Sequence, residues 1–170
     1  LVKKGTQDAI NAIETNIKKA DKSIEALIKS DENLKRLSDL VTSVASIGMV
    51  TCAAILVKTN EFQDFREAKK FACTSGLAPF EHTSGKSVRG KTRVSHRAHK
   101  DLKTLLHMCA LGAISRKGEL QDFYQRKVGQ GKNKMSVINA VRNKLIHRVF
   151  AVVRDGVMYQ KNYQYNLVMS

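Results

Sequence analysis

Tryptophan is absent from this chain, proline occurs once, and the three cysteines form no CxxC pair. Without tryptophan, the sequence does not indicate an amphipathic helix of the kind that anchors proteins at membrane surfaces. Isolated cysteines in apolar surroundings are typical of buried reduced thiols rather than of a disulfide or metal framework. No apolar run reaches the roughly 20 residues that a membrane-spanning helix needs, and no signal peptide opens the chain. These absences predict a cytoplasmic protein without membrane association.

Acidic residues are also scarce, and their shortage is uneven. The net charge is +15, yet residues 1–60 hold nine Lys/Arg against seven Asp/Glu, whereas the remainder holds twenty-one against eight. A positive surplus confined to one part of a chain favours a polyanion-binding face, so we expect nucleic acid as the partner. The few acids after residue 60 are scattered, which excludes a carboxylate cluster for two-metal catalysis. The histidines and cysteines match no usual zinc spacing, so no metal site is predicted in this chain.

The length of 170 residues fits one domain plus an appendage. We predict an N-terminal arm or connector over residues 1–37, a helical domain over 38–160 and a tail over 161–170. The chain opens at Leu1 rather than at a methionine, from which we expect a fragment of a longer protein.

The arm has the apolar spacing of a coiled coil. Its apolar positions alternate in steps of three and four, which is the pattern of a helix burying a narrow seam. The seam residues are Ile10, Ile13, Ile17, Ala20, Ile24 and Leu27, followed by Leu34. Asp31 interrupts the seam, and we expect Ser30 to cap a new helix there. Two readings stay open, because the seam can pack on its own domain or pair with a second subunit or another domain.

The next stretch predicts two helices, the first ending near Thr42 and the second beginning near Met49, around a turn that contains Gly48. A helix-hairpin-helix element has this layout, and the backbone amides at the start of its second helix can meet a DNA phosphate. An ordinary tight connection between helices explains the pattern equally well.

Further helices are predicted along the rest of the chain. Their expected ranges are Glu61–Ala72, a helix from near Ala98, Leu120–Val128 and about Lys134–Val153 closed by Gly156. Between Phe80 and Ser95 no helical period is visible, and we expect at most a short strand or hairpin. The predicted fold class is therefore mainly α, with a compact helical domain that carries a basic Gly/Ser loop.

The basic loop, from Thr83 to Lys103, is the predicted working segment. Its only acid is Asp101, and its basic residues are Lys86, Arg89, Lys91, Arg93, Arg97, Lys100 and Lys103. Guanidinium and hydroxyl groups bind phosphate, while glycines let the backbone approach closely. A merely solvated basic loop is the simpler alternative. A nucleophilic serine would need a neighbouring group to stabilise the transition state, and Ser84, Ser87 and Ser95 all lie near arginines.

At these residues the chain resembles the C-terminal core of insertion-sequence 110/116/902 transposases. The stretch TSGKSVRGKTRVSHRAHKDLKTLL is similar to the family pattern QSGKS.RGK.RISKRGNK.LR..L, and NKMSVINAVRNKLIHRVFAVVRDGVMY is similar to its closing helix. Upstream, SVASIGMVTCAAIL lies where the family has IPGIG..TA..LL, although Ala45-Ser46-Ile47-Gly48 departs from PGIG. The resemblance covers about residues 35–160.

The resemblance implies a bacterial, nucleoid-associated DNA recombinase with a composite active site. Its C-terminal part supplies a serine, here Ser84 with Ser87 and Ser95 as reserves, for cleavage through a phosphoserine link. The implied phosphate contacts are Lys86, Arg89, Lys91, Arg93, Arg97, Lys100 and Gly48. A RuvC-like domain with a DEDD site for Mg²⁺, not visible in this sequence, would complete the site, so the fragment alone would be inactive. A non-coding guide RNA, and dimers that assemble to a tetramer, are the implied partners beside DNA. A non-catalytic DNA- or RNA-binding module is the rival interpretation.

Overall fold

Helices make up nearly all of the regular structure. The structure is a computed structural model that describes residues 2–78, 83–84, 88–89 and 99–160. Its elements are α1 (Val2–Ser30), α2 (Glu32–Ser43), α3 (Met49–Thr59), α4 (Ala68–Thr74), β1 (Thr83–Ser84), β2 (Val88–Arg89), α5 (Lys100–Ser115), α6 (Glu119–Gly129) and α7 (Lys134–Asp155). The predicted mainly α fold is confirmed. None of the described helices is long and apolar enough to cross a membrane.

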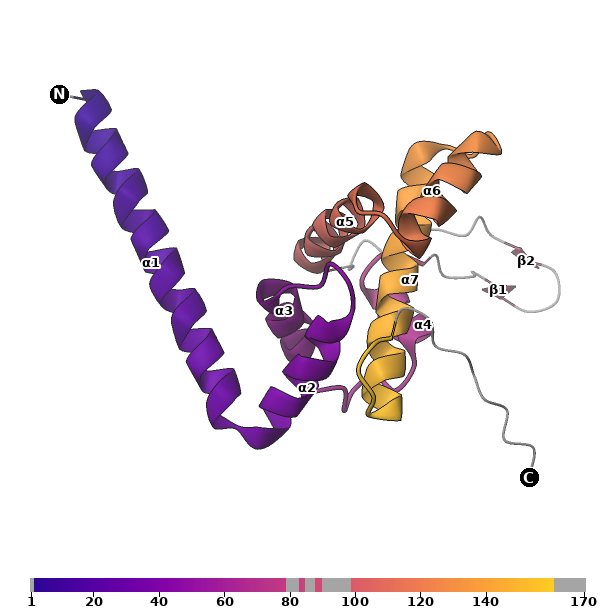
Figure 1. The fold of residues 1–170 in the computed structure, drawn as a ribbon, viewed down its shortest axis with the longest axis horizontal. Coiled ribbons are helices and arrows are strands. Elements are labelled where there is room, and N and C mark those ends of the chain that lie inside the picture. The colour runs from indigo at the N-terminus through magenta and orange to yellow at the C-terminus, as the bar shows by residue number, and fades with distance from the viewer. Residues whose placement is uncertain (1, 79–82, 85–87, 90–98, 161–170) are drawn as a thin grey trace.

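The core is built around α7, which packs against α2, α4, α5 and α6 (Figure 1). Apolar side chains recur on α7 at steps of three and four, and Val141, Leu145 and Ile146 are fully buried. Aromatic rings join α4 to this helix, because the Phe71 and Phe150 ring centroids lie 5.5 Å apart. Burial of this continuous apolar surface is the main stabilising contribution to the fold.

α1 leaves this core as a long arm. In Figure 1 it points away from the helical body and reaches it near the α1–α2 connection, where Ile28 is buried. The predicted seam is largely in solvent, since Ile13 is 60% and Leu27 is 65% exposed. Packing of the seam on its own domain is therefore not observed over residues 10–24. A stripe of large apolar side chains in water is unfavourable unless another surface covers it.

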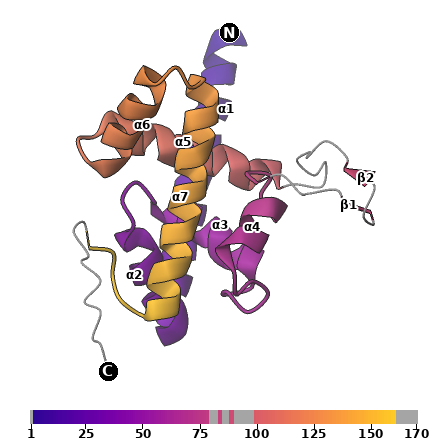
Figure 2. The same ribbon diagram turned by 90° about the vertical axis from the view of Figure 1, so that its right-hand side faces the viewer.

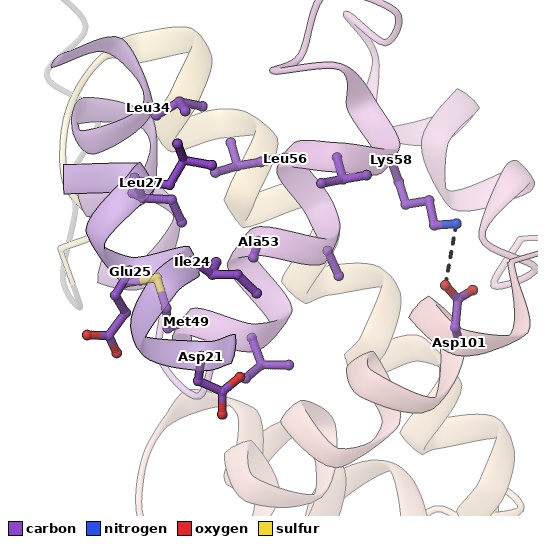
Figure 3. Close-up of a pocket in the computed structure, with 14 residues that line it drawn as sticks. Asp21, Ile24, Glu25, Leu27, Leu34, Met49, Ala53, Leu56, Lys58 and Asp101 are labelled. Atoms are coloured by element: carbon purple, nitrogen blue, oxygen red, sulfur yellow. Dashed lines mark ion pairs between the residues drawn. The ribbon is translucent and has the colours of Figure 1, made fainter. Parts of the chain in front are cut away.

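A groove continues the exposed stripe toward the body (Figure 3). It has a volume of about 560 Å³ and lies between the C-terminal half of α1 and the exposed face of α3. Ile24 and Leu27 of α1 line one side. Val50 and Val57 of α3 line the other side and are 57% and 78% exposed. The two helices thus present apolar surface to the same space.

The cap between α1 and α2 differs from the expected one. Ser30 is the last residue of α1, and its hydroxyl donates to the carbonyl of Leu27 at 2.8 Å. Asp31 is the cap of α2, because its carboxylate accepts from the Leu34 backbone N–H at 2.9 Å. The prediction of Ser30 as N-cap was wrong by one residue. Asp31 has the extended backbone of an N-cap, whereas the Ser30 hydroxyl is already bonded within α1.

The predicted helix over Glu61–Ala72 was also too long. α4 begins at Ala68, and the chain before it turns through Asn60, Glu61 and Phe62, whose φ angles are 48°, 54° and 64°. These left-handed residues cannot continue α3. The Thr59 hydroxyl accepts from the Phe62 backbone N–H at 3.1 Å and supports the turn. Phe62 still packs on the core, with its ring 5.1 Å from that of Phe150, so the apolar pattern was right but its backbone was not helical.

The other predicted boundaries are confirmed to within a few residues. α2 ends and α3 begins on either side of the turn that contains Gly48. α5 and α6 lie where the apolar pattern resumes, and α7 ends at Gly156, which adopts a left-handed φ of 65°. The three cysteines are free and buried as expected. Burial raises the pKa of the Cys52 thiol, which keeps it protonated and unreactive.

Candidate nucleic-acid interface

Both ends of the basic segment are fixed at the C-terminal end of α4. The backbone N–H groups of Leu77 and Ala78 donate to the carbonyl of Ala72 at 2.9 and 3.2 Å. On the return side, the backbone N–H of His99 donates to the carbonyl of Thr74 at 3.2 Å. The chain between residues 78 and 99 therefore leaves and re-enters the helical body at one place, which we call the root.

α7 supports the root from inside the core. The Asn139 side-chain amide donates to the carbonyl of Leu77 at 2.8 Å, and Leu77 itself is 2% exposed. Three residues further along α7, Arg142 is 7% exposed, and its Nε has no hydrogen-bond partner within the described residues. Desolvation lowers the pKa of Arg142, although an arginine stays charged at neutral pH. Because residues three apart share a helix face, this buried cation lies on the same side of α7 as the root contact.

α5 begins directly after the root and is tied to α3. Lys58 of α3 and Asp101 in the first turn of α5 form an ion pair at 3.4 Å (Figure 3). The backbone N–H of Leu102 and the Lys58 ammonium together hold the pKa of Asp101 below its usual value. Asp101 therefore stays ionised at neutral pH, and as an acid in the first turn it favours the helix. Lys100 precedes it and is exposed.

A short antiparallel hairpin carries part of the segment. β1 pairs with β2 so that Thr83 lies opposite Arg89 and Ser84 opposite Val88. The expectation of at most a short strand or hairpin is confirmed for these four residues. Figures 1 and 2 show both strands beyond α4, to one side of the helical body. The register places the backbones of Ser84 and Arg89 on adjacent strands, one position apart.

The predicted site residues divide into two groups. Ser84 and Arg89 have described backbones in the hairpin, Lys100 begins α5, and Gly48 precedes α3. The remaining predicted residues lie outside the described part of the chain, namely Lys86, Ser87, Lys91, Arg93, Ser95 and Arg97. Lys100 thus starts beside the root, the hairpin lies between residues 78 and 99 away from the helical body, and Gly48 belongs to a separate turn.

Gly48 is exposed and is the N-cap residue of α3, as a phosphate contact would require. Its φ of −96° does not require glycine, and an added Cβ would meet nothing within 4 Å. The residue that needs a left-handed backbone is Ser46, at φ 71°. Ser46 occupies the first glycine position of the PGIG pattern, so the turn keeps its left-handed residue without glycine. The departure from PGIG is visible in the sequence, but the left-handed φ of Ser46 was not predicted from it.

A basic turn between α6 and α7 was not among the predicted site residues. Residues 123–154 contain no Asp or Glu, and their eight basic residues are Arg126, Lys127, Lys132, Lys134, Arg142, Lys144, Arg148 and Arg154. Counting charged residues in short windows along the chain, rather than over residues 61–170 as a whole, would have revealed this acid-free stretch. Within the described residues, no group of three or more His, Cys, Asp or Glu could hold a metal ion.

The fold and the root define a helical domain that presents a basic, serine-bearing segment. The family model described as "Transposase IS116/IS110/IS902 family" matches residues 38–125, just over half of the chain. The pilin gene-inverting protein of Moraxella bovis is 30% identical over 161 residues, which is 94% of this chain and 50% of that protein. The chain therefore belongs to the IS116/IS110/IS902 transposase family.

More distant relatives agree with this assignment. The insertion element IS110 uncharacterized 43.6 kDa protein of Streptomyces coelicolor is 26% identical over 146 residues, 86% of this chain and 36% of that protein. The insertion element IS900 uncharacterized 42 kDa protein of Mycobacterium paratuberculosis is 24% identical over 151 residues, with coverages of 88% and 37%. The chain spans half or less of the length of these relatives.

Replacing Asn139 tests the support of the root. Asn139→Ala leaves the buried Leu77 carbonyl without its side-chain donor, and we expect a loss of about 1–2 kcal/mol in the free energy of unfolding, measured by urea denaturation. Asn143→Ala is the matched control on the same helix, because the Asn143 Oδ1 is buried without a hydrogen-bond partner within the described residues. A larger loss in Asn143→Ala than in Asn139→Ala would contradict the assigned contact.

Proposed function

We propose that this chain supplies the serine-bearing, phosphate-binding half of a composite active site for DNA transposition or site-specific recombination. The observation that carries the proposal is the root. The chain between Ala78 and His99 leaves and re-enters a packed helical core at one place, and it carries five Lys/Arg and a single acid, Glu81. Membership in a transposase family, and relatives that include a pilin gene-inverting protein, support DNA strand exchange as the activity.

The reaction centre is the Ser84 hydroxyl, with Ser87 and Ser95 as reserves. In the proposed step the serine oxygen bonds to phosphorus, and the bond from phosphorus to one deoxyribose oxygen breaks. The proton that the serine loses is matched by the proton that the leaving oxygen gains, so a phosphoserine link and a free hydroxyl result. Attack of a second DNA end on this link reverses the step and releases the serine.

The basic residues stabilise the negative charge that develops on phosphorus. Arg89 is paired through β1 and β2 with the strand of Ser84, which makes it the strongest candidate for a bidentate phosphate contact. The other residues proposed for this role are Lys86, Lys91, Arg93, Arg97 and Lys100. Gly48, at the exposed start of α3, would contact a phosphate further from the reaction centre.

The other half of the active site lies outside this chain in the proposal. A RuvC-like domain with a DEDD site would hold Mg²⁺ and activate the DNA, while a non-coding guide RNA would select its sequence. The chain covers 50% or less of its relatives, which leaves room for such a domain in a longer protein. We therefore expect the isolated chain to bind DNA in the bacterial cytoplasm without cutting it.

α1 is proposed to pair with α1 of a second copy. Its exposed seam has Ile10, Ile17 and Ile24 at three successive a positions and Ile13, Ala20 and Leu27 at the d positions between and after them, which is the apolar pattern of a coiled coil. No segment among the described residues covers this seam, and its apolar surface continues into the groove beside α3. A second copy would cover both at once, because each α1 ends at its own groove.

Charge decides the direction of the pairing. The flanking e positions hold the acids Glu14 and Asp21, whereas the g positions hold Ala9, Asn16 and Ser23. A parallel pair places e beside g of the other copy, so the acids meet neutral residues. An antiparallel pair places e beside e and brings Glu14 next to Asp21 of the second copy twice, at a cost of about 0.2–0.5 kcal/mol per pair. The parallel arrangement therefore avoids all like-charge contacts at these positions.

A rival function is a non-catalytic DNA- or RNA-binding module. The exposed N-terminus of α3 favours it, because that contact needs no nucleophile. In this case no serine substitution would affect anything but affinity, and Ser84→Ala would not abolish strand transfer.

Ser84→Ala in the full-length protein tests the proposed chemistry. We expect strand transfer to fall to background, by a factor of at least about 10³, because no oxygen remains to form the phosphoserine link. Duplex binding, measured by fluorescence anisotropy, should change by less than about threefold since the phosphate contacts remain. Ser87→Ala and Ser95→Ala are the matched controls and should retain transfer. Transfer that persists in Ser84→Ala and disappears in Ser95→Ala would move the nucleophile to Ser95.

Disulfide trapping tests the parallel pairing of α1. In a parallel pair the two Ile10 positions adjoin, so Ile10→Cys should cross-link to itself under mild oxidation. In an antiparallel pair Ile10 would face Leu27, about 25 Å along the helix from the other Ile10. A mixture of Ile10→Cys and Leu27→Cys chains would then give the mixed dimer only. The unmodified chain, whose three cysteines are buried, is the control for background. A monomer in sedimentation at high concentration would refute the pairing altogether.

A further inference from the structure

A second basic surface lies at the turn between α6 and α7. Arg126 and Lys127 stand in the last turn of α6, while Lys132 and Lys134 flank the cap of α7. Arg126, Lys132 and Lys134 are exposed, and Lys127 is half-buried. We call these four residues the α6–α7 basic turn. The stretch from residue 123 to 154 that contains it has no acid at all.

None of the four cations forms an ion pair within the described residues. Lys127 donates to the Gln130 side chain at 3.2 Å, and the Arg126 guanidinium lies 6.0 Å from the centre of the Phe123 ring. The nearest acid along α6 is Asp122, in the first turn of that helix. Arg126 shares a hollow with Glu119 and Asp122, so the charge that no acid of the fold offsets is that of Lys127, Lys132 and Lys134.

Two of the four cations stabilise the helix in which they lie, and two destabilise the start of α7. Arg126 and Lys127 lie at the negative end of the α6 dipole, so helix stability alone explains them. Lys134 is the first residue of α7 and stands at the positive end of its dipole, with Lys132 just before it. The first turn of α7 carries no acid, although Asn133 caps it well by accepting from the Met135 and Ser136 N–H groups. Lys132 and Lys134, on either side of the α7 cap, thus destabilise the start of this helix, and residues that break a local rule usually serve function.

We propose that the α6–α7 basic turn is a second contact surface for the phosphate backbone of duplex DNA. Lysines act as point charges on phosphate and carry no sequence information, so this surface would bind DNA without reading it. In Figure 2 α6 lies on the opposite side of α7 from β1 and β2. The turn would therefore hold a part of the DNA away from the one that meets the serine-bearing segment. The choice of DNA rests on the proposed function.

Reversing the two opposing charges tests this proposal. For the Lys132→Glu/Lys134→Glu chain we expect roughly tenfold weaker binding to a 30-base-pair duplex of arbitrary sequence at about 0.1 M salt. The slope of log affinity against log salt should fall by about 2, one for each lost phosphate contact. The melting temperature should rise by about 3 °C, because acids now stand at the positive end of α7. Weaker binding combined with higher stability is a pair of changes that a structural role for the lysines would not produce.

The matched control is Lys18→Glu/Lys22→Glu on the exposed outer face of α1, which changes the net charge by the same amount. We expect its affinity to stay within threefold of the unmodified chain. Equal losses in both variants would assign the effect to net charge and overturn the proposal. So would unchanged affinity in Lys132→Glu/Lys134→Glu, or a lower melting temperature together with weaker binding.

The same binding measurement with an RNA duplex of the same sequence distinguishes DNA from RNA as the partner. A loss confined to RNA would overturn the assignment to DNA. The outcome is separable from the proposed catalytic function, because strand transfer by Ser84 is measured in the full-length protein and requires no change at this turn. If Lys132→Glu/Lys134→Glu leaves the affinity unchanged, the strand-transfer result for Ser84→Ala still stands. If Ser84→Ala retains strand transfer, the affinity result for the basic turn still stands.

Discussion

The hydrogen bonds of the root are the constraint on which the rest of the site depends. They join the backbone N–H groups of Leu77, Ala78 and His99 to the last turn of α4. If the twenty residues between Ala78 and His99 had free ends, their charge would be spread over a large volume. Fixing both ends at one place restricts that volume and reduces the conformational entropy that DNA binding must remove. The packed core of α4, α5 and α7 matters to function because it holds these acceptors still.

Charge and apolar surface are separated along the chain. This separation assigns protein association to one part of the chain and polyanion binding to another. The arm α1 carries little net charge but a long apolar stripe, which suits association with another protein surface. The domain beyond residue 60 carries almost all of the surplus positive charge, which suits a polyanion. Self-repulsion among these cations opposes compact folding, and the apolar contacts of α7 offset it. The exposed Lys132 and Lys134, on either side of the α7 cap, show that the fold tolerates unfavourable local electrostatics at this turn.

Sequence patterns predicted the parts of this fold that depend on local chemistry. The steps of apolar residues located α1, α5, α6 and α7, and Gly156 located the end of α7. The patterns failed where a tertiary contact decided the backbone. The aromatic spacing of residues 62–71 is that of a helix. The structure instead has a left-handed turn at residues 60–62, supported by the Thr59 hydroxyl, and this turn directs the Phe62 ring into the core. At Ser46 the long-range packing of the turn against Gly112 of α5 accompanies a φ that serine rarely adopts.

The candidate site was predictable as chemistry but not as geometry. Composition indicated a phosphate-binding segment, and the family resemblance singled out Ser84. No local signal indicated that Ala78 and His99 would meet at α4 or that Asn139, 62 residues from Leu77, would hold the root. Such contacts follow from how α4 and α7 pack, which a single sequence does not encode in any short pattern.

The most direct test of this account is to locate the covalent bond between protein and DNA. A full-length protein that contains this chain would be stopped during strand transfer, digested with protease and nuclease, and analysed by mass spectrometry for a peptide that carries a nucleotide remnant. We predict the remnant on Ser84, in the peptide between Arg66 and Arg89 or a shorter product of it. A remnant on a tyrosine or on a serine outside residues 83–103, or strand transfer without any covalent peptide, would contradict it.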